Sequence, residues 1–154
     1  MHPNIIIRNA SIDDAASIAS ILRAIGDFPH VNAESHADTT RRIRDRIEHS
    51  ISSHDQILVA SVDGEICGYG AMRWLQNLLL NGVDGYLSEL FIHPLHAGKN
   101  VGTSIIGEFR KEAKRMKAER IWCINLKDRE SYRRGFYKKM GWEERNIAVF
   151  MEKQ

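Results

Sequence analysis

The segment from Tyr86 to Leu126 constrains the fold of this 154-residue chain more than any other part. It reads as a strand that stops before Pro94, a loop with glycines, an amphipathic helix over 98–117 and a second strand over 121–126. Apolar residues recur in the helix every three to four positions, with charged residues between them. A strand–helix–strand run makes a right-handed crossover, which places the two strands parallel in one sheet.

Elements outside this run extend the sheet with antiparallel strands. Asp63-Gly64 suits the two-residue type I′ turn of a hairpin. Further strands are predicted at 5–8, 57–62, 65–75 and within 142–151, and further helices at 15–25, after Ser35 and at 130–140. We therefore predict an α/β fold, a mixed and mostly antiparallel sheet with one parallel pair, flanked by about four helices.

The composition agrees with one domain over residues 1–154. Hydrophobic residues make up 43% of the chain, which is enough for a core without disulfides or metal. No stretch approaches the roughly 20 apolar residues of a membrane span. Cys67 and Cys123 form no CxxC pair, and we expect free thiols in a reducing compartment. The expected location is cytoplasmic, with no membrane partner.

The loop from His96 to Thr103 runs directly into a helix, whose first turn presents unpaired backbone N–H groups. The helix dipole adds partial positive charge, so such a site favours phosphate or pyrophosphate. Gly98 and Gly102 let the backbone approach an anion, and Lys99 and Thr103 can add a charge and a hydroxyl. The loop matches neither GxxxxGK[ST] nor GxGxxG, so ATP and NAD chemistry are poorly supported. From these residues alone, an ordinary surface loop is the alternative.

The same residues resemble the GNAT superfamily of acetyl-CoA-dependent N-acetyltransferases. The chain carries the family's strand end as Ile92-His93-Pro94 and its loop as Ala97-Gly98-Lys99-Asn100-Val101-Gly102. A second family element, an aromatic pair before a Gly-aromatic turn, reads Phe136-Tyr137-Lys138-Lys139-Met140-Gly141-Trp142. The family usually has Arg or Gln at Ala97 and glycine at Asn100. Asparagine tolerates left-handed backbone well, so we expect Asn100 to take the place of glycine.

The resemblance implies acetyl-CoA as co-substrate and an amine as acceptor. In this family the two parallel strands splay apart and the pantetheine arm lies between them. The implied CoA-binding residues are Phe91, Ile92, Ala97, Gly98, Lys99, Asn100, Val101, Gly102, Thr103, Asn125 and Arg134. The oxyanion donor is expected to be a backbone N–H between Leu90 and Ile92. The resemblance also makes a homodimer a plausible assembly.

Two residues are candidates for proton transfer. Glu89 is a lone carboxylate in an apolar strand and the candidate general base, acting directly or through water. Its alternative is a solvent-facing or arginine-paired side chain. Tyr137 is implied as the general acid for the CoA thiolate, and its alternative is a core aromatic residue.

Other functions fit the sequence less well. His93 and His96 lack an identifiable third ligand, so no metal is expected. The arginines at 41–46 lack interleaved aromatics and the net charge is only +2, so no nucleic acid is expected. Two alternatives stay open: a non-catalytic GNAT-fold module that binds acyl-CoA or a partner, and an RNA- or ribosome-associated modifier. The acceptor is unspecified, and its pocket is expected between the first two helices and an apolar-tipped loop at 77–84.

Overall fold

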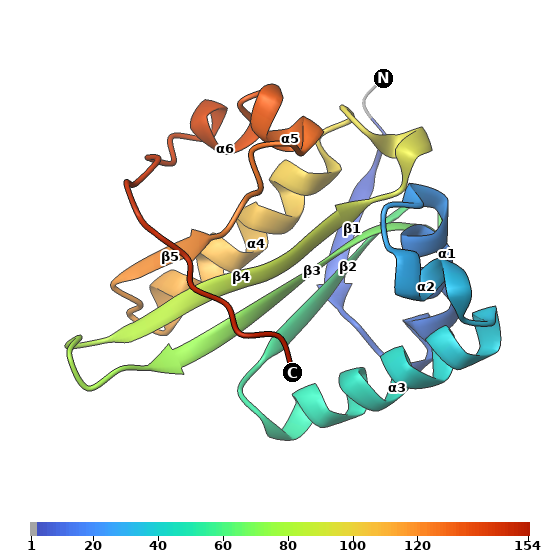
Figure 1. Ribbon diagram of the computed structural model, residues 1–154, viewed down its shortest axis with the longest axis horizontal. Coiled ribbons are helices and arrows are strands. Elements are labelled where there is room, and N and C mark those ends of the chain that lie inside the picture. Colours follow the sequence, from blue (N-terminus) through green and yellow to red (C-terminus); the bar gives the residue numbers. More distant parts are fainter. Residues whose placement is uncertain (1–2) are drawn as a thin grey trace. The chain divides into compact units, whose positions relative to one another are not determined.

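The computed structural model describes residues 3–154, in two compact units that meet in sequence between Cys123 and Ile124. The first unit holds one five-stranded sheet, in the order β1 (Ile5–Asn9), β2 (Gln56–Val62), β3 (Glu65–Gln76), β4 (Val83–Ile92) and β5 (Arg120–Cys123). Neighbours from β1 to β4 are antiparallel, and β4 and β5 are parallel (Figure 1). The predicted mixed sheet with one parallel pair is confirmed.

Six α-helices lie within residues 3–154, where about four were predicted. They are α1 (Ala15–Ile25), α2 (Pro29–Ala33), α3 (His36–Ser52), α4 (Val101–Arg115), α5 (Glu130–Arg133) and α6 (Phe136–Lys139). The short α2 begins at Pro29, a residue suited to a first helical turn. The helix predicted at 130–140 is divided because Gly135 has a left-handed backbone, with φ of 64°. These two features account for the larger number.

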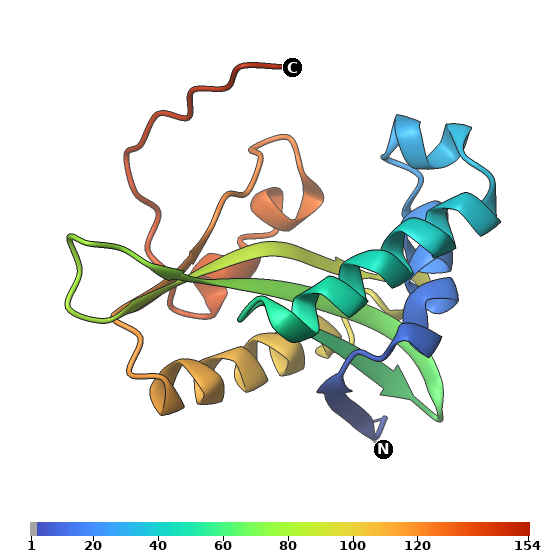
Figure 2. The ribbon, with the colours of Figure 1, turned by 90° about the horizontal axis from the view of Figure 1, so that it is seen from below.

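Helices of the first unit cover opposite faces of its sheet, α4 on one and α1 with α3 on the other (Figure 2). Consecutive residues of β3 show the alternation, since strand side chains point to the two faces in turn. Tyr69 belongs to the core cluster of α1 and α3. A side chain at Gly70 would lie 2.8 Å from Ile105 and 2.9 Å from Phe109 of α4. The absence of a side chain at Gly70 therefore lets α4 pack tightly on the sheet.

Three local signals in the sequence are confirmed, two at the starts of helices and one at a hairpin turn. The Ser11 N–H donates to Asp14 at 2.8 Å, in a reciprocal cap that starts a 3-10 turn leading into α1. The Ser35 hydroxyl accepts from the Asp38 N–H at 3.1 Å at the start of α3. Asp63 and Gly64 have φ of 51° and 85°, the two left-handed residues that a type I′ turn requires.

The loop between β3 and β4 is fixed at its base by a buried carboxylate. Asp84 is 1% exposed and accepts from Arg120 Nε at 2.9 Å, Arg120 Nη2 at 3.1 Å and Asn77 Nδ2 at 3.0 Å. At the tip, Leu78 and Leu79 are exposed, as predicted. The hydrogen bonds to Asp84 thus fix the two ends of the loop from which the apolar tip extends.

The second unit, Ile124–Gln154, corrects two strand predictions. The strand predicted at 121–126 already ends at Cys123, and residues 143–154 form no strand. A strand needs a hydrogen-bonded neighbour, and apolar residues alone do not supply one. Ile147, Val149 and Phe150 are accordingly exposed.

Neither cysteine is part of a disulfide, and Cys67 is buried while Cys123 is half-buried. Burial raises the pKa of the Cys67 thiol. Within the described residues, the helices include none with the length and apolar character needed to cross a membrane.

Candidate functional site

Strand β4 changes register at Ser88. Ala71 lies opposite Glu89 and Met72 lies opposite Leu87, so Ser88 is the extra residue of a β-bulge. The Ser88 hydroxyl donates to the carbonyl of Ala71 at 3.2 Å. A bulge bends its strand and redirects the side chains beside it. Here the side chain that follows the bulge is that of Glu89.

The parallel pairing of β4 with β5 ends at the same place. It joins residues 84–87 to residues 120–123, and β4 continues to Ile92 with no strand beside it on that edge in the described part of the first unit. The His93 N–H donates to the carbonyl of Cys67 at 2.8 Å, toward β3. Because successive N–H groups of a strand point to opposite edges, those of Leu90 and Ile92 point to the open edge.

A second set of backbone donors lies at the start of α4. Asn100 is left-handed, with φ of 64° and ψ of 10°, as expected for the residue that replaces glycine. The first helical hydrogen bond runs from the Ser104 N–H to the Asn100 carbonyl at 2.9 Å. The N–H groups of residues 101–103 precede that bond and so have no acceptor within the helix. Among the described residues, no side chain caps this end of α4.

The two sets of donors are neighbours because the end of β4 and the start of α4 both lie close to Gly68. A Cβ atom on Gly68 would lie 2.7 Å from Ile92 Cδ1 and 3.1 Å from Val101 Cγ1. The open edge of β4 and the N-terminus of α4 therefore form one region. In addition to Phe91, this region contains eight predicted CoA-binding residues: Ile92, Ala97, Gly98, Lys99, Asn100, Val101, Gly102 and Thr103.

Glu89 lies on the opposite face, the one that α1 and α3 cover. The hydroxyl of Tyr69 donates to Glu89 Oε1 at 3.3 Å, and Tyr69 is only 4% exposed. The Phe91 ring lies 5.8 Å from the Tyr69 ring and packs edge-on against Phe28 at 5.1 Å. Glu89 is half-buried beside this aromatic group. The residues described thus pair it with a tyrosine and not with an arginine.

Tyr69 was not among the residues predicted from the sequence. Burial raises the pKa of its hydroxyl well above the usual 10.0, and the nearby Glu89 carboxylate raises it further. Arg42 acts in the opposite direction. At neutral pH the hydroxyl therefore keeps its proton and serves as a donor.

The remaining predicted residues, Asn125, Arg134 and Tyr137, belong to the second unit. Asn125 Oδ1 accepts from the Ser131 hydroxyl at 3.0 Å, and Arg134 Nε lies 3.9 Å from a carboxylate oxygen of Glu130. The Tyr137 ring packs at 5.0 Å from Phe136 and 5.3 Å from Trp142. The Trp142 N–H donates to the Tyr137 carbonyl at 3.0 Å, which closes the turn at Gly141. The roles of these three residues toward a cofactor stay predictions.

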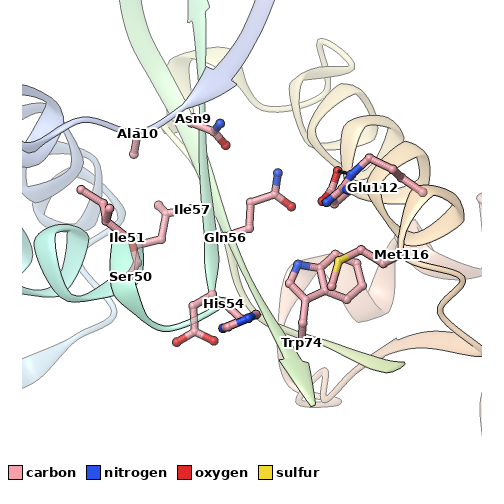
Figure 3. Close-up of a pocket in the computed structure, with 12 residues that line it drawn as sticks. Asn9, Ala10, Ser50, Ile51, His54, Gln56, Ile57, Trp74, Glu112 and Met116 are labelled. Carbon is pink, nitrogen blue, oxygen red and sulfur yellow. Dashed lines mark hydrogen bonds and ion pairs between the residues drawn. The ribbon is translucent and has the colours of Figure 1, made fainter. Parts of the chain in front are cut away.

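A hollow of about 410 Å³ lies elsewhere in the first unit, beyond the end of β1 and beside α4 (Figure 3). Gln56, Trp74 and Met116 line it, and it contains none of the predicted site residues. Its carboxylates are already engaged, Asp55 with Arg73 and Glu112 with Arg115. The region at β4 and α4 has backbone N–H groups without an acceptor in their own helix or strand. It is therefore better supported as a binding site than this hollow.

That region suits an anion and not a cation, because backbone N–H groups donate hydrogen bonds and cannot ligate a metal. In residues 3–154, no three or more His, Cys, Asp or Glu side chains are grouped so that they could hold a metal ion.

Comparison with protein families identifies the arrangement. The Acetyltransferase (GNAT) family matches residues 20–142 of the chain. The chain belongs to this family. The match spans β4, the loop into α4 and the aromatic turn near the C-terminus. The predicted family and the predicted acyltransferase class are both confirmed, and members of the family generally use acetyl-CoA.

Solved structures share the fold at low sequence identity. A transcriptional regulator from Bacillus halodurans C-125 is 18% identical, with a TM-score of 0.80 over 97% of this chain and 100% of that one. A ribosomal-protein-alanine N-acetyltransferase from Brucella melitensis biovar Abortus 2308 is 16% identical, with a TM-score of 0.73 over 97% and 100%. Glucosamine-6-phosphate N-acetyltransferase from Arabidopsis thaliana is 18% identical, with a TM-score of 0.74 over 98% and 99%. No curated protein sequence matches the chain, and these identities support the fold alone.

Proposed function

We propose that the chain transfers an acetyl group from acetyl-CoA to a primary amine by direct attack, as a single domain over residues 1–154. The observation that carries this proposal is the junction over Gly68, where the open edge of β4 meets the left-handed start of α4. Unpaired N–H groups and the helix dipole at that junction suit a pyrophosphate. The family match covers both elements.

The loop fits such a ligand although Ala97 lacks the donor side chain that is usual in the family. The position of a Cβ on Gly98 has no atom within 4 Å, so the backbone is open to an approaching anion. Lys99 and Thr103 are exposed and can add a charge and a hydroxyl donor. Asn100 keeps the left-handed turn at which α4 begins, and the N–H groups of residues 101–103 have no acceptor within the helix. Binding is therefore proposed to rest on the backbone.

The remaining contacts with the cofactor are part of the same proposal. The edge of β4 at Phe91 and Ile92 is placed beside the pantetheine arm, with Asn125 as a further contact. Arg134 is proposed to meet the phosphates. Neither cysteine is part of a disulfide, which agrees with a reducing compartment, so a cytoplasmic location belongs to the proposal as well. A homodimer is proposed on family grounds alone.

The mechanism assigns one task to each group of the chain. Bound acetyl-CoA supplies an activated thioester carbonyl. Glu89 takes a proton from the amine, directly or through one water, as the new C–N bond forms and the C–S bond breaks. One backbone N–H on the open edge, that of Leu90 or Ile92, donates to the carbonyl oxygen while it carries negative charge. Tyr137 is proposed to give a proton to the departing thiolate, so that the products are the N-acetyl amide and CoA.

The test is the release of CoA thiol from acetyl-CoA against a panel of small amines, amino acids, polyamines and peptides with free N-termini. We expect turnover with at least one acceptor, and a fall in kcat of about 10²-fold or more in Glu89→Gln. Acetyl-CoA affinity, measured by calorimetry, should be unchanged in that variant. Glu65→Gln, an exposed carboxylate at the start of β3, is the matched control and should keep full turnover.

Two results would contradict the proposal in different ways. Acetyl-CoA binding without turnover of any amine would favour the non-catalytic binding module. A loss below tenfold in Glu89→Gln would leave the enzyme class intact and remove Glu89 from the role of base.

A further inference from the structure

We propose that Tyr69 is a positioning residue for Glu89, holding one carboxylate oxygen so that the other is presented to the acceptor amine. This inference rests on the proposed function, in which Glu89 takes the proton of the amine. The hydroxyl of Tyr69 donates to Glu89 Oε1 at 3.3 Å. Among the described residues, Glu89 Oε2 accepts no hydrogen bond, so one oxygen is held and one is available.

The register of β3 and β4 creates this pair. Tyr69 lies opposite Phe91, and Ala71 lies opposite Glu89, so Tyr69 and Glu89 are diagonal neighbours on one face. A register shift of one residue moves a side chain to the other face of a sheet. The extra residue at Ser88 therefore decides that Glu89 shares a face with Tyr69 and not with α4.

The hydroxyl has a fixed place because the ring that carries it is fixed. Tyr69 is 4% exposed and packs in the core cluster with α1, α3 and the Phe91 side chain. A glutamate side chain has several rotatable bonds, and ordering it has an entropic cost that a fixed partner offsets. Because a misplacement of ~1 Å can lower a rate ~10²-fold, such a partner matters for a base.

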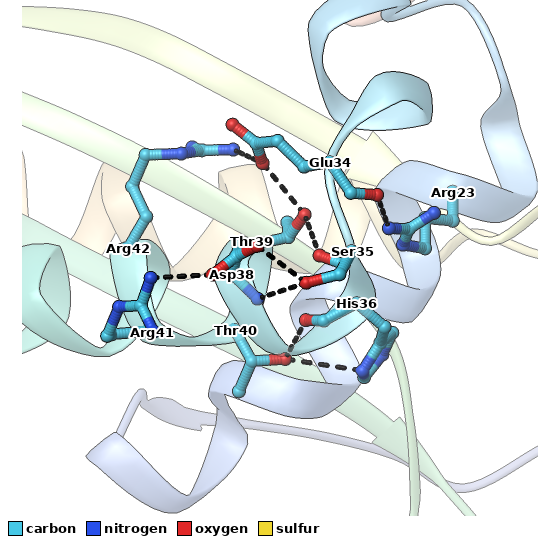
Figure 4. Close-up of polar contacts among 9 residues, drawn as sticks. All are labelled: Arg23, Glu34, Ser35, His36, Asp38, Thr39, Thr40, Arg41 and Arg42. Carbon is cyan, nitrogen blue, oxygen red and sulfur yellow. Dashed lines mark hydrogen bonds and ion pairs between the residues drawn. The ribbon is translucent and has the colours of Figure 1, made fainter.

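Arg42 of α3 is already paired with another carboxylate, that of Glu34. Arg42 of α3 is close enough to influence the hydroxyl of Tyr69. It is held by Glu34 at 2.8 Å, and Glu34 in turn accepts from the buried Thr39 hydroxyl at 2.8 Å (Figure 4). The α2–α3 junction thus anchors the guanidinium, and in the described structure the carboxylate of Glu89 accepts from the tyrosine.

The test compares Tyr69→Phe with a matched control, at saturating acetyl-CoA and acceptor. Tyr69→Phe keeps the ring and removes the hydroxyl, and we expect kcat to fall about tenfold with acetyl-CoA affinity and unfolding temperature near wild type. The control is Tyr86→Phe, a β4 tyrosine whose ring stacks on Trp122 at 4.5 Å, and it should keep full turnover.

A double-mutant cycle separates positioning from a structural role. In a Glu89→Gln background, Tyr69→Phe should cause no further loss, because no base is left to position. Equal losses in both backgrounds, or full turnover in Tyr69→Phe, would overturn the inference. If Glu89→Gln alone kept turnover, Glu89 would not be the base. That result concerns the proposed function and can be told apart from a failure of this inference, because it is measured with Tyr69 unchanged.

Discussion

Asn100 carries the left-handed turn that begins α4, and substitution there isolates the energetic cost of that turn. Its side chain makes no capping hydrogen bond in the described structure, so Asn100→Ala changes the backbone preference and little else. A left-handed backbone costs an ordinary residue about 1–2 kcal/mol, and asparagine adopts it more readily. We therefore expect Asn100→Ala to lower the free energy of unfolding by about 1 kcal/mol. In a chain of this size that is a fall in Tm of about 2–4 °C.

Asn100→Gly is the informative partner of that variant, because glycine adopts the same backbone without strain. It should unfold at or above the wild-type temperature and bind acetyl-CoA with wild-type affinity. Asn100→Ala should bind more weakly, since the first N–H groups of α4 lose their direction. Thermal unfolding and calorimetric titration with acetyl-CoA measure the two effects separately.

Lys117 supplies the control at the other end of α4. It is also left-handed, with φ of 55°, so Lys117→Gly should raise stability without changing acetyl-CoA affinity. Identical stability of the Ala and Gly variants at position 100, or wild-type affinity in Asn100→Ala, would mean that this turn does not order the site.

Two further predictions concern stability. Within the described residues, Arg120→Ala leaves the buried carboxylate of Asp84 with the hydrogen bond from Asn77 alone, and should lower the urea midpoint of unfolding; an unchanged midpoint would contradict the assigned role of this pair. The hydrogen bond from Arg8 lowers the pKa of Asp14, so the stability it contributes is present above about pH 4 and is lost as pH falls through the lower, folded pKa. Asp14→Asn should therefore reduce the loss of stability between pH 7 and pH 3, and an unchanged loss would argue against it.

Much of the first unit could be predicted because its signals are local. Asp63-Gly64 marks a hairpin through its backbone preference alone, and Asn100 marks a left-handed helix start in the same way. The crossover from β4 through α4 to β5 follows from handedness and from the spacing of apolar residues.

Features that depend on a distant partner could not be predicted in this way. Residues 142–151 contain apolar residues, yet a strand forms only where another strand pairs with it. The contact of Tyr69 with Glu89 depends on the bulge at Ser88, and no local residue preference marks that position. The sequence therefore indicated Glu89 and the loop as candidates, while the hydrogen bond from Tyr69 to Glu89 could be found only from the strand register.

Acetyl-CoA is proposed to bind where the open edge of β4 meets the start of α4. A titration with CoA, followed through backbone amide resonances, tests it most directly. We predict that the largest shifts fall on Leu90, Ile92 and residues 101–103, with the indole N–H of Trp74 unmoved. Shifts centred on Trp74 and Gln56 instead would place the ligand in the hollow beside α4 and contradict the account.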